Sequence, residues 1–160
     1  MSQWPTARLD PVRQLRVLAE VLPGVGLVER VLDAPYARVW SFLEDLERSV
    51  PAFDPMVRSL RVLAREGEHL TVATWMPHLP IPLRFEVELR DGWCLMRSRP
   101  YLVGMAAVPI EGDRTHYAHL EGLPVGRLPV LRPLRPLFRH IVHGDVDGIS
   151  RALEPPPPAR

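Results

Sequence analysis

Cysteine is almost missing from this chain, because Cys94 is the only one among 160 residues. A single cysteine excludes an internal disulfide bond and a zinc site built from cysteines, and it fits a reducing cytoplasm. Lysine and asparagine are missing altogether, and the formal net charge is only +1. So small a charge gives no strong attraction to nucleic acid or to an anionic membrane. We therefore expect no nucleic-acid partner.

Long apolar runs are missing as well. The N-terminal segment MSQWPTARLDP carries none, so we expect no signal peptide. No apolar stretch approaches the ~20 residues that a membrane-spanning helix needs. Together these observations predict a cytoplasmic protein without a membrane span. The content of hydrophobic residues, 46%, and of charged residues, 24%, is ordinary for a globular chain, and the length suits one domain with one core.

Prolines are plentiful, 19 in all, and most of them mark the ends of predicted elements. Asp10 and Pro11 suit the cap and the first position of a helix over about 10–22. A strand over 25–32 follows. The predicted division of the chain is an N-terminal extension (1–24), a main domain (25–153) and a Pro-rich tail (154–160).

The stretch DAPYARVWSFLEDLERSVPAFDPMV at 33–57 predicts a short helix, with Trp40 beside its apolar stripe. Proline lacks an N–H and clashes with the preceding turn. We therefore expect this helix to end before Pro51, after about three to four turns. Pro55 then limits a second short piece.

From Val57 onward apolar and polar residues alternate, which is the pattern of strands. The alternation is cleanest from Leu83 to Arg90, and it indicates an antiparallel strand with one face in water. Six strands are predicted after the short helices, at 57–66, 69–76, 83–91, 94–102, 104–110 and 115–123.

The last predicted element is a helix over 137–153, with a stripe at i+4 spacing that begins at Leu137 and Ile141. Gly144 and Gly148 each cost a helix about 1 kcal/mol relative to alanine. Two such residues one turn apart indicate that the helix closely approaches something. That neighbour is either the backbone of the sheet or a bound ligand.

The predicted order of elements is strand, two short helices, six strands and a long C-terminal helix. Residues 32–63 also contain an APxxxVW pattern, from Ala34 to Trp40. In both features the chain resembles the START/Bet v1-like (SRPBCC) superfamily, whose members are often labelled polyketide cyclase/dehydrase and lipid-transport proteins. The resemblance implies an α+β helix-grip fold, in which a curved antiparallel sheet of about seven strands wraps around the long C-terminal helix, with two short helices after the first strand. It also implies a cavity between sheet and helix that takes up apolar ligands.

Strand alternation selects the side chains that face such a cavity. In the last strand either the odd-numbered residues from Thr115 to Glu121 or the even-numbered residues from His116 to Leu120 can face inward, and we favour the first set. The residues expected to bind the ligand are Val72, Thr74, Met76, Phe85, Val87, Met96, Ser98, Tyr117, His119, Phe138, Ile141, Val142, Asp145 and Ile149.

Few of these side chains suggest catalysis. Tyr117, His119 and Ser98 are candidates for proton transfer, because histidine is the usual acid or base near neutral pH. The alternative is that they are ordinary sheet residues. Cys94 is expected to be a small buried hydrophobe.

No metal site and no cofactor are predicted. His140 and His143 lie three residues apart, with Asp147 one turn further on. This spacing suits a metal, but a fourth ligand is not evident, and a solvated helix face is the simpler interpretation.

Three functions fit the sequence. The first is binding of an apolar small molecule such as a lipid, quinone or polyketide. The second is an enzyme of the cyclase, aromatase or dehydratase type, although no catalytic constellation is evident. The third is a protein-interaction module that uses the helix at 10–22 or Trp75.

Overall fold

The computed structural model describes residues 8–99, 101–124 and 129–154, so most of the predicted Pro-rich tail lies outside it. The helices are α1 (Pro11–Val21), α2 (Tyr36–Leu43), α3 (Leu46–Phe53) and α4 (Arg135–Ala152), with a 3₁₀ turn η1 (Pro129–Leu134) before α4. The strands are β1 (Val25–Leu32), β2 (Ser59–Glu66), β3 (His69–Trp75), β4 (Leu83–Arg90), β5 (Trp93–Arg97), β6 (Leu102–Ile110) and β7 (Arg114–Gly122).

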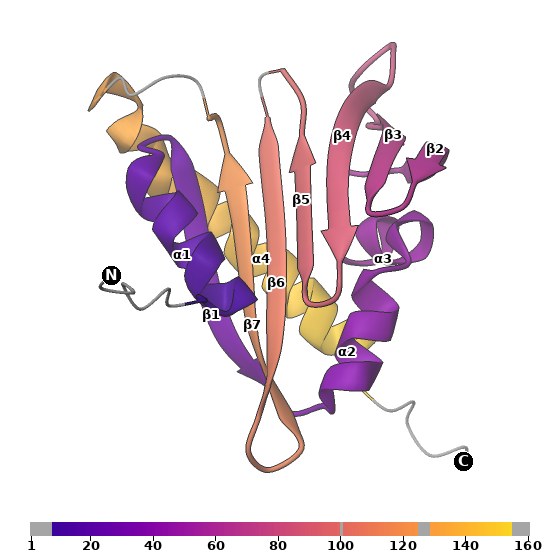
Figure 1. Cartoon of the computed structure of the whole chain (residues 1–160). Coiled ribbons are helices and arrows are strands. Elements are labelled where there is room, and N and C mark those ends of the chain that lie inside the picture. The colour runs from indigo at the N-terminus through magenta and orange to yellow at the C-terminus, as the bar shows by residue number, and fades with distance from the viewer. Residues whose placement is uncertain (1–7, 100, 125–128, 155–160) are drawn as a thin grey trace, which may run out of the picture.

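In the part of the chain that the structure describes, seven antiparallel strands form one sheet in the order β1-β7-β6-β5-β4-β3-β2. α4 crosses one face of the sheet, and α1 lies on the other (Figure 1). α2 and α3 follow β1, and α3 contacts both β2 and α4. This is the predicted α+β helix-grip architecture.

α1 begins as the sequence predicts, because the side chain of Asp10 accepts a hydrogen bond of 2.9 Å from the backbone N–H of Arg13. The apolar face of this helix packs on the sheet through Val12, Leu15 and Ala19. None of the described helices is both long and apolar enough to cross a bilayer.

The prediction that Pro51 ends the first short helix was wrong. The chain breaks instead at Glu44 and Asp45, and Pro51 lies inside α3. A proline within a helix removes one backbone hydrogen bond. The buried side chains of Val50 and Phe53 hold α3 against the core and offset that loss.

The strand predicted at 94–102 is in fact two elements. β5 ends at Arg97, and the backbone N–H of Ser98 donates a 2.8 Å hydrogen bond to the carbonyl of Tyr101. β6 then starts at Leu102. Ser98 therefore does not continue the inward-facing row of β5.

β7 lies between β1 and β6 in the sheet, and its residue His119 pairs with Val28 of β1 and Met105 of β6. Its odd-numbered residues face α4, as favoured from the sequence, since Tyr117 packs in the same cluster as Val142 of α4. The even-numbered Ala118 and Leu120 pack under α1.

The buried face of α4 agrees with the predicted stripe except at its start. Leu137 is 55% exposed, and Ile141 is only half-buried. The rest of the predicted stripe, Asp145, Ile149 and Leu153, is buried, and so are the flanking residues Phe138, Val142 and Val146. The close approach predicted from the glycines occurs at Gly148 alone, and its neighbour is α3 rather than the sheet, whereas Gly144 is open to solvent.

Candidate functional site

A small cavity lies between α3 and the strands that face it. Its volume is ≈ 30 Å³, enough for one or two water molecules. This is far below the ~300 Å³ of an ordinary ligand pocket. The cavity is lined by Val50, Phe53, Asp54, Val57, Thr74, Met76, Phe85, Met96, Tyr101, Val103, Met105 and Glu121.

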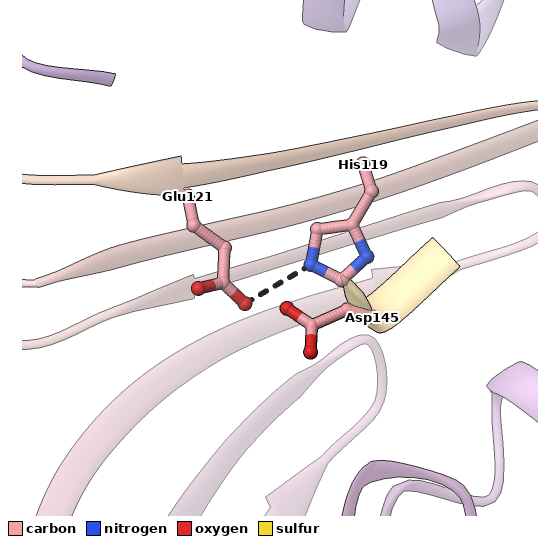
Figure 2. A group of neighbouring side chains, drawn as sticks. All are labelled: His119, Glu121 and Asp145. Atoms are coloured by element: carbon pink, nitrogen blue, oxygen red, sulfur yellow. Dashed lines mark hydrogen bonds and ion pairs between the residues drawn. The ribbon is translucent and has the colours of Figure 1, made fainter. Parts of the chain in front are cut away.

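Four of the residues predicted to bind a ligand line this cavity: Thr74, Met76, Phe85 and Met96. Other predicted residues belong to the surrounding core, and these are Val72, Val87, Tyr117, Val142 and Ile149. The ring of Phe138 lies 5.9 Å from the ring of Tyr101. His119 and Asp145 are buried beside Glu121 (Figure 2).

Ser98 and Ile141 do not line the cavity. Ser98 lies instead beside a hollow that it shares with the charged residues Arg84, Glu86, Arg97 and Arg99. His140 and His143 are exposed on α4, which agrees with the solvated face expected for them.

Sequence reasoning missed a large part of the cavity wall. Val103, Met105 and Glu121 lie in β6 and β7, where alternation applies, but they were not among the predicted residues. Phe53, Asp54 and Val57 come from the end of α3 and the segment after it, and Tyr101 directly precedes β6. Alternation cannot identify residues outside strands. The only local signal was the aromatic and acidic character of Phe53, Asp54 and Tyr101.

A chain of hydrogen bonds runs along the inner face of β7. The hydroxyl of Tyr101 donates to Glu121 Oε2 at 2.7 Å, and Glu121 Oε1 lies 3.1 Å from His119 Nε2. His119 Nδ1 lies 2.8 Å from the hydroxyl of Tyr117. Three of these residues are two positions apart in one strand, so their side chains project to the same side.

Asp145 approaches this chain from α4 (Figure 2). The residue is 2% exposed, and its Oδ2 has no hydrogen-bond partner among the described residues. Burial, followed by the negative charges of Glu121 and Asp54, raises the pKa of Asp145 to about 9.

Asp54 is the third carboxyl group here. Burial and the charge of Glu121 raise its pKa to about 6, opposed by a hydrogen bond from the backbone N–H of Met56. Burial also raises the pKa of Tyr101 and of Tyr117 above the usual tyrosine range.

The three carboxyl groups have little compensating positive charge. Among the described residues, Glu121 pairs only with His119, and the salt bridges include neither Asp54 nor Asp145. Burying a carboxylate without a positively charged partner costs free energy. The site therefore favours bound protons or a cation.

At the level of sequence, no family model and no curated protein matches the chain. Solved structures do resemble it. The Zhui aromatase/cyclase from Streptomyces sp. R1128 is 13% identical with a TM-score of 0.57, and the match covers 80% of this chain and 93% of that one. A START superfamily protein from Mycobacterium smegmatis is 14% identical with a TM-score of 0.56, covering 81% and 99%.

A third similar structure is norcoclaurine synthase from Thalictrum flavum in complex with dopamine and hydroxybenzaldehyde. It is 15% identical with a TM-score of 0.54, and the match covers 81% of this chain and 85% of that one. These likenesses define the class of fold: the chain has the helix-grip fold of START/Bet v1-like proteins. The expectation drawn from residues 32–63 is thus confirmed for the fold.

Proposed function

We propose that the protein binds a small, largely apolar molecule such as a lipid, quinone or polyketide in the cavity beside α3. The main observation in support is that the hydroxyl of Thr74, a residue of the cavity wall, has no hydrogen-bond partner among the described residues. Buried polar groups almost always have a partner. A ligand with one polar group would satisfy Thr74 and place its apolar body among the surrounding side chains.

The small volume means that a ligand has to open the cavity. Met76, Met96 and Met105 form part of its wall. Methionine is unbranched and adapts its shape readily, so these side chains are the ones that we expect to move. The aromatase/cyclase and the norcoclaurine synthase complex support a small-molecule role by analogy of fold alone.

Acid–base catalysis of the cyclase, aromatase or dehydratase type is a second candidate. The hydrogen-bonded chain from Tyr101 through Glu121 and His119 to Tyr117 supports it, because such a chain can pass a proton from the cavity wall inward. Glu121 would contact the substrate, while His119 and Tyr117 would act behind it. Ser98 has no place in this arrangement.

The proposal includes a cytoplasmic location, as the single cysteine indicates. A protein partner for α1 would have to contact Val17 and Val21, which are 48% and 62% exposed, since the opposite face of the helix packs on the sheet.

Native mass spectrometry of the purified chain tests the binding proposal. We expect an apolar molecule to co-purify, or a fluorescent fatty-acid probe to bind at one site per chain. Val103→Trp, at a half-buried residue of the cavity wall, should fill the cavity and weaken probe binding, whereas Leu63→Trp, at an exposed position of β2, should not. If neither a co-purified molecule nor probe binding is found, the proposal fails.

A further inference from the structure

Three side chains from two elements converge on one buried point beside the cavity. His119 and Glu121 project from β7, and Asp145 projects from α4 toward them (Figure 2). Each offers one ligand atom, and these atoms lie within 4.8 Å of one another. In a zinc site each ligand atom is ~2.0–2.2 Å from the ion, so small side-chain rotations would bring all three into contact with a single ion.

The charges of these groups match a divalent cation. Two carboxylates and one neutral imidazole around a doubly charged ion have no net charge, which suits a buried site. His119 is fully buried, and Glu121 and Asp145 are 3% and 2% exposed. Asp145 Oδ2 has no hydrogen-bond partner among the described residues, so one oxygen of the group is left for a ligand.

Neighbouring hydroxyl groups hold two of these side chains in suitable orientations. Tyr117 is hydrogen-bonded to His119 Nδ1 at 2.8 Å, which leaves Nε2 directed at Glu121. Tyr101 donates to Glu121 Oε2 at 2.7 Å, which leaves Oε1 directed at His119. Histidine ligands in metalloproteins are usually fixed in this way through their second ring nitrogen.

We propose that His119, Glu121 and Asp145 bind one divalent first-row transition-metal ion, with Zn²⁺ as the reference case. Mixed nitrogen and oxygen ligands suit zinc and its neighbours better than they suit calcium or magnesium. Glu121 also lines the cavity, whose ≈ 30 Å³ can hold a water molecule as a fourth ligand. Three protein ligands and one exchangeable position are the arrangement of catalytic rather than structural zinc sites.

The competing interpretation is that protons alone neutralise the cluster, with one proton shared between Asp145 and Glu121. Bound protons and a bound metal ion would each compensate the same buried negative charge. Only the metal interpretation requires stoichiometric binding of an ion, and that binding can be measured without any organic ligand. The test of zinc binding and the test of apolar-probe binding can therefore give negative results independently of each other.

The test uses the full chain after removal of metals with EDTA. Calorimetric titration with Zn²⁺ should show one ion per chain. Asp145→Asn keeps the shape of the side chain and removes its charge, and it should weaken zinc binding by more than the ~10–100-fold that loss of an outer hydrogen-bond partner costs. Circular dichroism and thermal unfolding without metal show whether the variant is folded.

The matched control removes the exposed groups of α4, with His143→Ala and Asp147→Asn together. Zinc binding should survive this change, because these side chains lie on the solvent face. Wild-type protein with Co²⁺ should show visible absorption bands typical of four or five ligands, and Zn²⁺ should abolish them. This measurement decides the question even if Asp145→Asn is unstable.

Three results would overturn the inference. One is the absence of a Co²⁺ spectrum together with no stoichiometric zinc binding. Another is zinc binding by Asp145→Asn as tight as that of the wild type. The last is loss of binding in the surface control, which would assign the ion to the histidines on the outside of α4.

Discussion

Gly148 of α4 lies directly against the backbone of Phe53 at the end of α3. A Cβ atom added at position 148 would lie 2.6 Å from the carbonyl oxygen of Phe53, which is closer than such atoms can approach. This contact is where the long helix meets the wall of the cavity, because Phe53 is one of the lining residues.

Gly148→Ala should therefore destabilise the protein, by about 1–3 kcal/mol as for other overpacked sites. Gly144→Ala is the matched control: nothing lies within 4 Å of its added Cβ, and alanine in a helix should stabilise by about 0.5–1 kcal/mol. Urea unfolding of both variants measures the difference. Equal changes in unfolding free energy for the two variants would show that α4 does not pack closely on α3 at position 148.

Trp40→Ala should cost about 3–5 kcal/mol, the range for deleting a large buried aromatic side chain. Trp40 is 5% exposed and packs in the main core. Chemical denaturation measures the loss, with Ser41→Ala on the exposed side of α2 as a control. A loss of unfolding free energy below ~1 kcal/mol would contradict the burial of Trp40 in the core.

Replacement by valine should destabilise the protein at one buried threonine and not at another. Thr74 Oγ1 has no hydrogen-bond partner among the described residues, so Thr74→Val should leave stability unchanged or raise it by about 1 kcal/mol. Thr115 Oγ1 donates to the carbonyl of Ala34 at 2.8 Å, and Thr115→Val should cost about 1–3 kcal/mol. Thermal unfolding of the pair is the measurement, and a large loss at Thr74 would reveal a hidden partner there.

The thiol of Cys94 should not react in the folded protein. Burial raises its pKa to about 12, and the residue is fully buried. A raised pKa favours the neutral thiol, so the reactive thiolate is scarce until the pH approaches that value. We expect no reaction with a disulfide reagent at pH ~8, and a full reaction after unfolding in guanidinium. Rapid labelling of the native chain would contradict this packing.

The local alternation of apolar and polar residues was sufficient to predict which side chains face inward in most of the sheet. In β4 the alternation from Leu83 to Arg90 predicted Phe85 and Val87 as inward, and both are buried. The reason is that strand geometry repeats every two residues, so one face follows from neighbouring residues alone. The same reasoning placed Tyr117 and His119 on the inner face of β7.

Prediction from local pattern failed where packing between elements overrides the intrinsic preference of a residue. Pro51 is a helix breaker by its own chemistry, but α3 continues through it because its buried side chains hold it in place. Leu137 fits a helical stripe, but it is exposed because packing turns the next residue, Phe138, toward the interior instead.

The sequence by itself determined the order of the elements, the inward face of the strands and the resemblance to the helix-grip fold, because these depend on short-range periodicity. Only the tertiary structure decided that Asp145 meets Glu121 and His119, and that the cavity is small. These three residues are brought together by the rotation of α4 about its axis and by its path across the sheet. Both are set by side-chain packing between elements distant in the chain, for which local pattern carries no signal.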